Sequence, residues 1–203
     1  MGKRINKDAI DHFQDYGIHT PTRTLYIGSE SYDPEAGESG VDGLLAERHI
    51  KNLLILDSVS QDPITIILNN PGGDVYHGMA IYDAIRACKS HVTVRGTGYV
   101  MSMASLIIQA ADERQMTENA IMMLHHGYDN HPSNHVKTIR SWADFGKRYD
   151  ARLNKIYLAK IREKYPEFKY KKLDQMLDFD TQLFPEDALQ LGLIDKIYCK
   201  NED

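Results

Sequence analysis

The stretch ITIILNNPGGDVYHGMAIYDAIRACKSHVTVRG, residues 64–96, holds the pattern that decides the fold. Residues 64–68 form a short, continuous run rich in β-branched side chains, which is typical of a strand buried on both faces. The Pro and Gly residues of NNPGGD end that strand, and apolar residues then return at helical spacing over 75–88. A second strand is predicted at 91–96. The stretch is therefore one strand–turn–helix–strand unit.

The same alternation continues downstream. GYVMS (98–102) is expected to be a turn and MASLIIQAA (103–111) a helix, and MTENAIMMLHH (116–126) supplies another turn and strand. Strand, turn and helix thus alternate about three times, which predicts an α/β fold with mostly parallel crossovers.

The chain upstream of this unit is expected to begin with an N-terminal arm at 1–22, which is polar and carries Pro21. A short strand is predicted at 25–27, and the Gly, Pro and Ser content of 29–40 marks a loop. Apolar spacing over 41–59 is close to helical.

Downstream, residues 135–164 have no Pro and no Gly after Gly146, so we expect one long helix. The last helix begins near Pro185 and ends before Gly192, and LIDKIYC (193–199) is a final strand. The domain organisation predicted from these elements is the arm followed by a single domain at 23–203.

Composition limits the class of protein. The chain has 203 residues, 42% of them hydrophobic, and a net charge of −5, so it has no general attraction for nucleic acid or anionic membranes. The basic and aromatic segment KYPEFKYKK (164–172) favours a solvated helix-to-loop stretch over a nucleic-acid patch. Cys88 and Cys199 lie far apart, so a reducing cytoplasm is expected. The first residues lack the apolar core of a signal peptide, and no apolar run approaches a membrane span.

In open α/β sheets, functional groups collect at the carboxyl ends of strands, and three such ends carry unusual residues. The first is the turn at Gly72 and Gly73, where a backbone N–H could bind a developing oxyanion. A plain turn explains a Pro-Gly-Gly better when it stands alone.

The second strand end is at Ser102, which opens an apolar helix after a glycine turn. The N–H of Met103 would be free there, and the helix dipole favours negative charge. An N-cap serine is the commoner explanation of such a residue on its own. The segment is not the G-x-S-x-G elbow, because Val100 and Ala104 stand at its glycine positions.

The third strand end is at His125, a candidate general base because the pKa of histidine lies near neutrality. A hydrogen-bonded structural histidine is the alternative. The other histidines close by do not have zinc-site spacing, and no cysteine helps, so no metal is expected. These histidines are His126, His131 and His135.

Asp180, in LDFDTQLF (177–184), could orient the base and complete a triad, although a helix-capping Asp is the alternative and Asp178 is a rival. Each signal is weak by itself. The chain order of a Gly-Gly turn, then Ser, His and Asp is what favours nucleophilic catalysis.

Four segments carry a resemblance to the ClpP family of self-compartmentalising serine peptidases, over about residues 23–198. The first resembles the family's strand, Asn-Ser-Pro-Gly-Gly and helix, the second its Ala-Ala-Ser-Met-Gly-Ala nucleophile segment, and the third its Met-Ile-His-Gln-Pro segment. The fourth resembles its C-terminal block with the catalytic Asp. They are ILNNPGGDVYHGMAIYDAI (67–85), GTGYVMSMAS (96–105), IMMLHHG (121–127) and DTQLFPEDALQLGLIDKI (180–197).

The resemblance implies a role for each matching residue. Ser102 would be the nucleophile, His125 the general base and Asp180 the orienting carboxylate, since counting back from Gly192 selects Asp180 over Asp178. Backbone N–H groups of Gly72 and Met103 would hold the oxyanion. The implied fold is a crotonase-like core of repeated β-β-α units with a projecting handle helix at about 135–164.

The resemblance also implies a homo-oligomer of heptameric rings stacked in pairs, with the active sites facing an inner chamber fed by an ATP-driven unfoldase. Peptide cleavage itself would need no metal or other cofactor. Two alternatives remain. One is a non-catalytic or capsid-maturation scaffold subunit of ClpP type, and the other is a crotonase-type acyl-CoA enzyme, disfavoured because no Glu stands near Ser102 or the Gly-Gly turn.

The chain departs from the family pattern at several positions. Phe179 stands where many members have an Arg that pairs between rings, and YDNHPSNH (128–135) replaces a Gly-Gly motif. Thr65, Ile67 and Ala87 replace aromatics of the unfoldase-docking pocket, so weak docking is expected. These departures fit a specialised, phage-type member of the family.

Overall fold

The computed structural model describes residues 7–29, 40–127 and 135–199. Seven α-helices, eight strands and two short 3-10 turns are assigned within these residues. The strands are β1 (Ile18–His19), β2 (Thr24–Ile27), β3 (Ile64–Asn70), β4 (Val92–Met101), β5 (Glu113–Thr117), β6 (Ile121–Leu124), β7 (Thr181–Leu183) and β8 (Lys196–Tyr198). The helices are α1 (Lys7–Tyr16), α2 (Gly43–Val59), α3 (Val75–Ala87), α4 (Met103–Ile107), α5 (Val136–Lys164), α6 (Tyr170–Leu177) and α7 (Pro185–Leu191), and the 3-10 turns are Thr20–Thr22 and Ile108–Ala110.

The strands form one mixed sheet in the order β1-β2-β3-β4-β5-β8, with β6 and β7 branching from β4. All pairs from β2 to β8 along this path are parallel, as is β4 with β6, whereas β1–β2 and β6–β7 are antiparallel. The mostly parallel α/β architecture predicted from the sequence is therefore confirmed.

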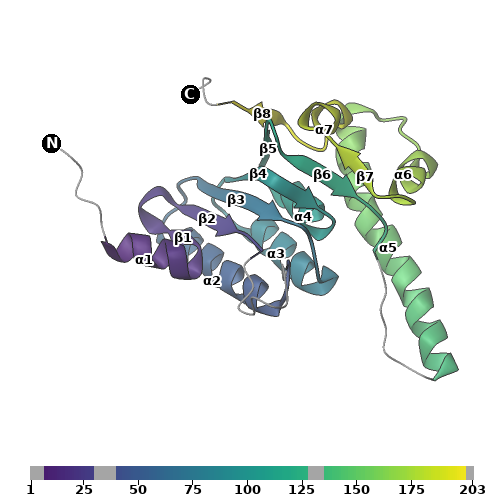
Figure 1. Cartoon of the computed structure of the whole chain (residues 1–203), viewed down its shortest axis with the longest axis horizontal. Coiled ribbons are helices and arrows are strands. Elements are labelled where there is room, and N and C mark those ends of the chain that lie inside the picture. The colour runs from purple at the N-terminus through teal and green to yellow at the C-terminus, as the bar shows by residue number, and fades with distance from the viewer. Residues whose placement is uncertain (1–6, 30–39, 128–134, 200–203) are drawn as a thin grey trace.

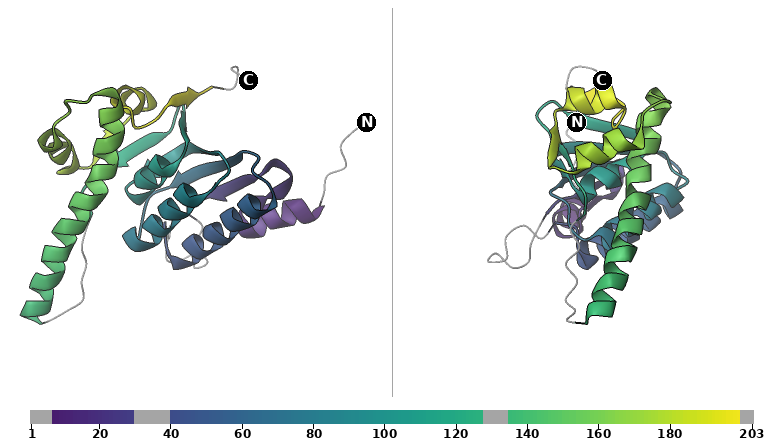
Figure 2. Two further views of the ribbon diagram at one scale, coloured as in Figure 1. Left: turned by 180° about the vertical axis from the view of Figure 1, so that it is seen from behind. Right: turned by 90° about the vertical axis from the view of Figure 1, so that its right-hand side faces the viewer.

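Helices α2, α3 and α4 cover one face of this sheet, as the view from behind in Figure 2 shows. Side chains of β3 alternate accordingly: Ile64, Ile66 and Leu68 are fully buried beneath the helices, whereas Thr65 and Ile67 are only half-buried. The expectation that this strand is buried on both faces was wrong, because among the described residues α2, α3 and α4 all cover the same face and leave Thr65 and Ile67 half-buried on the other.

Strand β4 is longer than expected. The segment GYVMS was predicted to be a turn, yet β4 continues to Met101, with a register irregularity against β3 between Leu68 and Asn70. The first half of β4 pairs with β5 and its second half with β6, so the strand bridges two parts of the sheet. This extension carries Ser102 to the edge where β6 ends.

Strand β5 was not predicted at all, because Glu113–Thr117 has neither apolar alternation nor a β-branched run. Its position is set by tertiary contacts. Arg114 is 4% exposed and forms an ion pair with Asp195, just before β8, and also donates to Gln109 Oε1 and the Gly192 carbonyl.

Helix α5 occupies Val136–Lys164, where one long helix was expected, and its N-terminal half projects well beyond the body of the molecule (Figure 1). Its C-terminal half is anchored in the core through Leu153, Tyr157 and Ile161. At the opposite end of the sheet, β1 pairs with β2, and the Asn52 side chain of α2 donates to the Tyr16 carbonyl at the end of α1. Among the described residues no helix is long and apolar enough to cross a membrane.

Candidate active site

Ser102 lies between the end of β4 and the start of α4 with φ 50° and ψ −120°, a backbone conformation that residues other than glycine rarely adopt. The turn is held on one side by the Ser102 N–H, which donates to the Met123 carbonyl of β6 at 2.9 Å. On the other side Gly72 lies so close that a Cβ built on it would be 2.5 Å from the Ser102 Cβ. Only glycine fits at that position.

His125 follows β6 directly, and because β4 and β6 are parallel neighbours their carboxyl ends meet at one edge. Its Nε2 atom lies 2.7 Å from the Ser102 hydroxyl oxygen, which is hydrogen-bond distance. The structure thus brings together two residues that are 23 positions apart in the sequence.

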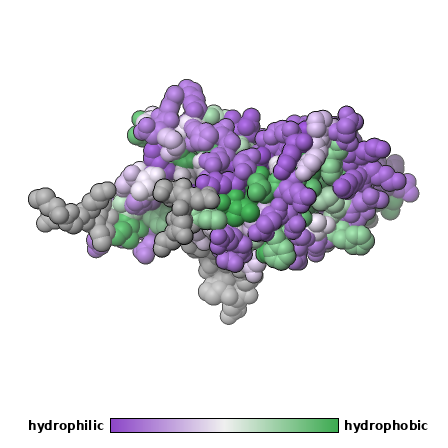
Figure 3. Space-filling view, turned by 90° about the horizontal axis from the view of Figure 1, so that it is seen from above, coloured by the Kyte–Doolittle hydropathy of each residue, from purple (hydrophilic) through white to green (hydrophobic). Residues whose placement is uncertain are grey.

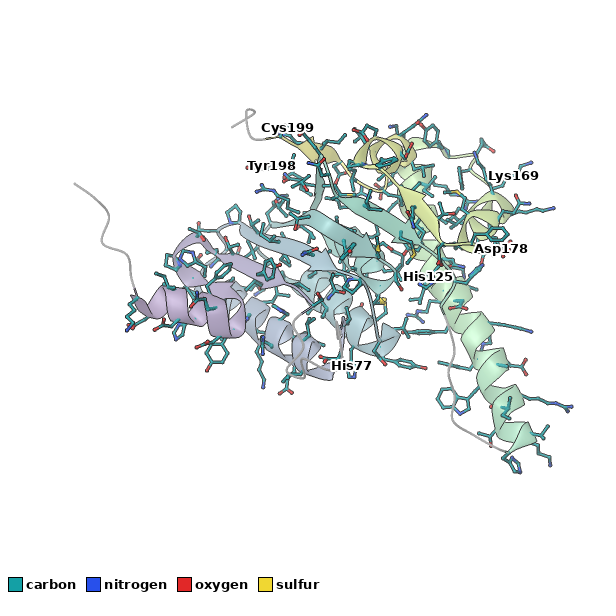
Figure 4. The ribbon with its side chains drawn as sticks, in the orientation of Figure 1. His77, His125, Lys169, Asp178, Tyr198 and Cys199 are labelled. Atoms are coloured by element: carbon teal, nitrogen blue, oxygen red, sulfur yellow. The ribbon has the colours of Figure 1, made fainter. Side chains whose placement is uncertain are left out.

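Asp180 precedes β7, which runs antiparallel to β6 with Thr181 opposite Leu124. This pairing places Asp180 beside His125, with 3.5 Å between its Oδ1 and the histidine Nδ1. The rival Asp178 instead lies 3.8 Å from Nε2 of His126, which Asp174 also approaches at 3.5 Å. Figure 4 shows His125 and Asp178 on neighbouring segments beside α5, with His77 well apart.

The Gly-Gly turn does not offer the N–H group that the sequence indicated. The Gly72 N–H donates to the side-chain oxygen of buried Asn70 at 2.8 Å, so it is not available to an oxyanion. The N–H group of the next residue, Gly73, has a different direction. Val41 pairs with one edge of the turn through the Gly72 carbonyl and the Asp74 N–H.

Since backbone groups of successive residues in an extended chain point to opposite edges, the Gly73 N–H is directed away from Val41. Within residues 7–29, 40–127 and 135–199, neither this N–H nor that of Met103 has a hydrogen-bond acceptor. The Met103 N–H belongs to the first turn of α4, where such groups have no partner in the helix. The N–H groups of Gly73 and Met103 are therefore the ones at this site that a ligand could bind.

Burial lowers the pKa of His125 below its ordinary value of 6.5, and the electrostatic influence of the neighbouring His126 lowers it further, whereas the carboxylates of Asp180 and Asp150 raise it. The imidazole is therefore neutral at pH 7 and can accept a proton. The carboxylate of Asp180 is more exposed than the imidazole, with 59% of its side chain accessible against 12% for His125.

A cavity of about 580 Å³ opens beside Ser102 and His125 and is walled on one side by α5. Aromatic rings dominate this wall. Tyr149 stacks on Phe145 at 5.6 Å and on Tyr76 of α3 at 5.5 Å, and the ring of Trp142, one turn before Phe145, lies 5.9 Å from that of Phe145. Sequence reasoning missed these residues, although positions 142, 145, 149 and 153 repeat at helical spacing and could have shown an apolar stripe.

Those of the candidate metal-ligating histidines that the structure describes do not gather into one cluster. His126 pairs with carboxylates of the α6 end, His135 lies at the start of α5, and His131 is outside the described residues. No group of three or more potential ligands lies together in the described parts of the chain.

Comparison with known proteins gives a consistent result. The family model of Clp protease matches residues 38–201. The chain is 35% identical over 168 residues to the ATP-dependent Clp protease proteolytic subunit 2 of Pseudomonas aeruginosa, covering 81% of this chain and 80% of the relative. It is 32% identical over 160 residues to the ATP-dependent Clp protease proteolytic subunit of Deinococcus radiodurans, covering 77% and 76%. A solved structure, a point mutant of ClpP1 from Listeria monocytogenes, superposes with a TM-score of 0.74 at 30% identity, covering 90% of this chain and 95% of that one.

Proposed function

Because the chain belongs to the Clp protease family, we propose that it is a serine endopeptidase subunit of a self-compartmentalised Clp-type protease, with Ser102, His125 and Asp180 as its triad. The observation that carries the proposal is the 2.7 Å contact between His125 Nε2 and the Ser102 hydroxyl, at the rim of a 580 Å³ cavity. A nucleophile and a base within hydrogen-bond reach, with a carboxylate behind the base, form the arrangement that acyl transfer requires.

In this mechanism the Ser102 hydroxyl oxygen attacks the scissile carbonyl carbon while His125 Nε2 takes its proton. Asp180 accepts a hydrogen bond from the protonated Nδ1 and stabilises the imidazolium. The 3.5 Å separation of these two groups is longer than a good hydrogen bond, and such contacts commonly tighten when substrate binds. His125 then protonates the leaving amine, and water repeats the sequence to release the acid.

The oxyanion of the tetrahedral intermediate is held by the N–H groups of Met103 and Gly73. The proposal takes Gly73 in place of Gly72, since the Gly72 N–H is already bonded to Asn70. Each donor is worth about 3 kcal/mol of transition-state stabilisation. The open edge at Gly73 also suits an extended peptide, which would pair with it as an added strand and place one side chain in the aromatic-walled cavity.

The proposed assembly is a pair of stacked heptameric rings with α5 as the handle. The exposed apolar side chains Val136, Ile139 and Trp142 on the projecting half of α5 support a role in contacts between subunits. Phe179 lies beside the proposed triad with 77% of its surface exposed, at the position where relatives pair by an Arg. Substrates are unfolded proteins, delivered by an unfoldase where one docks.

The test compares hydrolysis of a fluorogenic apolar peptide by the wild type, by Ser102→Ala and by the control Ser58→Ala, which removes a serine hydroxyl on the exposed side of α2. Native mass spectrometry of the same samples gives the assembly state. We expect Ser102→Ala to lose activity by roughly 10⁴-fold or more with its assembly intact, because the nucleophile is absent.

Hydrolysis by Ser102→Ala near the wild-type rate would reject the triad. An inactive wild type in an intact ring would instead favour a scaffolding subunit. Labelling of the wild type by a serine-directed phosphonate separates a peptidase from an acyl-CoA hydratase, which has no such nucleophile.

A further inference from the structure

A buried pair of hydroxyl groups lies directly behind the Ser102 turn. The Ser105 hydroxyl oxygen is 2.6 Å from the Ser102 carbonyl oxygen and 2.6 Å from the hydroxyl of Tyr157 on α5. Ser105 is 0% and Tyr157 2% exposed, so water does not compete for these bonds. The family pattern Ser-Met-Gly-Ala has an alanine where this chain has Ser105, so the pair is a feature of this chain.

The directions of the two hydrogen bonds follow from their chemistry. A carbonyl oxygen can only accept, so Ser105 donates its single hydroxyl proton to the Ser102 carbonyl. Ser105 then has no proton left for Tyr157, so the Tyr157 hydroxyl donates to the Ser105 oxygen. These two consecutive hydrogen bonds form a relay that runs from Tyr157 on α5 through the Ser105 hydroxyl to the carbonyl of Ser102.

The carbonyl at the end of this relay belongs to the peptide unit whose N–H is that of Met103. It accepts a second hydrogen bond from the Ser105 N–H at 3.0 Å. Hydrogen bonds to a carbonyl draw electron density toward its oxygen, which makes the N–H of the same peptide a stronger donor. Two such bonds also fix the plane of the peptide and thus the direction of its N–H.

We propose that Ser105 and Tyr157 are positioning residues that orient and polarise the Ser102–Met103 peptide, so that the Met103 N–H meets the oxyanion of the transition state. The inference rests on the proposed function, because it assigns a task to the same site. It also explains how Ser102 keeps its positive φ of 50°, a strained conformation that persists only when surrounding contacts hold it.

Two hydrogen bonds of Gln109 support this reading of the geometry. The Gln109 side chain donates to the Ser105 carbonyl and to the Leu193 carbonyl, both at 3.1 Å, which ties the short helix α4 to the chain just after α7. Ser105 is therefore held from both sides, and its hydroxyl cannot turn away from Ser102 without breaking buried bonds.

The experiment measures kcat and KM for Tyr157→Phe, which removes only the relay's terminal hydroxyl. Tyr165→Phe is the matched control, because it deletes a hydroxyl that the residue just after α5 donates to the Gln190 carbonyl, away from the site. We expect kcat of Tyr157→Phe to fall about five- to tenfold with KM within twofold, a fraction of the loss on deleting an oxyanion donor. The control should match the wild type.

Two further measurements separate positioning from a merely structural role. A peptide boronate, which mimics the tetrahedral intermediate, should bind Tyr157→Phe more weakly by the same factor as kcat/KM falls. In a Ser105→Ala background, Tyr157→Phe should cause no additional loss, since the relay is already cut.

The inference is overturned if Tyr157→Phe keeps kcat within twofold of the wild type, or if it lowers kcat equally with and without Ser105. Because Tyr157 lies on α5, the proposed handle, native mass spectra of each variant check that a loss of kcat does not come from a defect in assembly. Failure here in an active wild type leaves the proposed function intact, whereas an inactive wild type that resists phosphonate labelling rejects the proposed function itself.

Discussion

At the scale of single residues, the proposed role of His125 as the general base means that its pKa should determine where activity is lost on the acid side. Burial holds that pKa below 6.5, and the base acts only when neutral, so kcat/KM should fall as the pH drops through a value lower than 6.5. We expect the enzyme to keep most of its activity at pH 6.5, as measured by the pH profile of kcat/KM on an uncharged peptide.

A variant that tests the same electrostatics is His126→Gln, which places the glutamine of the family motif beside His125. The electrostatic influence of His126 lowers the pKa of His125, so replacing the imidazole by a neutral amide should move the acid limb to higher pH without changing the plateau greatly. An acid limb at or above pH 6.5 in the wild type, or a shift to lower pH in His126→Gln, would contradict this account of the site's electrostatics.

The sequence alone predicted which residues meet but not every donor they use. Ser102, His125 and Asp180 could be named because each follows or precedes a recognisable element and the family motif fixes their order. The engagement of the Gly72 N–H could not, because it depends on the rotamer of Asn70. The contact of Ser105 with Tyr157 joins positions 52 apart, and no local pattern predicts it.

At the scale of elements, the turn after β3 depends on Asn70. Its side chain accepts from the Gly72 N–H and donates to the Gly28 carbonyl at 2.5 Å, so it ties the turn to the end of β2. Asn70→Ala would leave both groups buried and unpaired. We expect it to lower the free energy of unfolding by about 3 kcal/mol in urea titrations, and to lower kcat because the adjacent Gly73 shifts.

The neighbouring Asn69→Ala is the matched control, because Asn69 only accepts from the Tyr99 N–H near the surface. It should cost about 1 kcal/mol and change kcat little. Equal losses of stability in the two variants would show that the buried hydrogen bonds of Asn70 contribute no more to the free energy of unfolding than the hydrogen bond of Asn69.

Element prediction succeeded where periodicity was strong and failed where tertiary contacts decide. Helices α2, α3 and α5 lie within two residues of their predicted bounds, α2 and α3 because apolar residues recur at helical spacing and α5 because the segment has no Pro and no Gly after Gly146. Strand β5 has polar residues instead, and its buried Arg114 is compensated by an ion pair with Asp195, a partner 81 positions away, and by hydrogen bonds to Gln109 and to the Gly192 carbonyl. Such a pair cannot be read from local sequence.

At the scale of the whole molecule, the second face of the sheet matters most for partners. In Figure 1 this face is turned toward the viewer, and the register places Thr65, Thr93 and Glu113 in one row across it. The next row contains Ile67, Arg95 and Gln115, in which Arg95 donates to Gln115 and lies 3.4 Å over the ring of Tyr198. Hydrophilic side chains also dominate the face of the molecule seen in Figure 3.

A polar face of this kind gives an apolar docking loop little area to bury, and apolar burial is worth only about 25 cal/mol per Å². The family's docking pocket has aromatics where this chain has Thr65 and Ile67. We therefore expect a standard unfoldase to stimulate degradation of a tagged folded protein weakly or not at all. ATP-dependent degradation by the reconstituted pair is the measurement.

The double variant Thr65→Tyr with Ile67→Tyr tests whether weak unfoldase docking is caused by the side chains on this face of the sheet. Both positions are half-buried on β3 and pair with neighbouring strands, so added rings would lie over the sheet without entering the core beneath it. The variant should gain stimulation while its hydrolysis of small peptides stays unchanged, because β3's second face lies on the opposite side from α4 and the Ser102 turn. Strong stimulation of the wild type would refute the argument, since a polar sheet face would then suffice for docking.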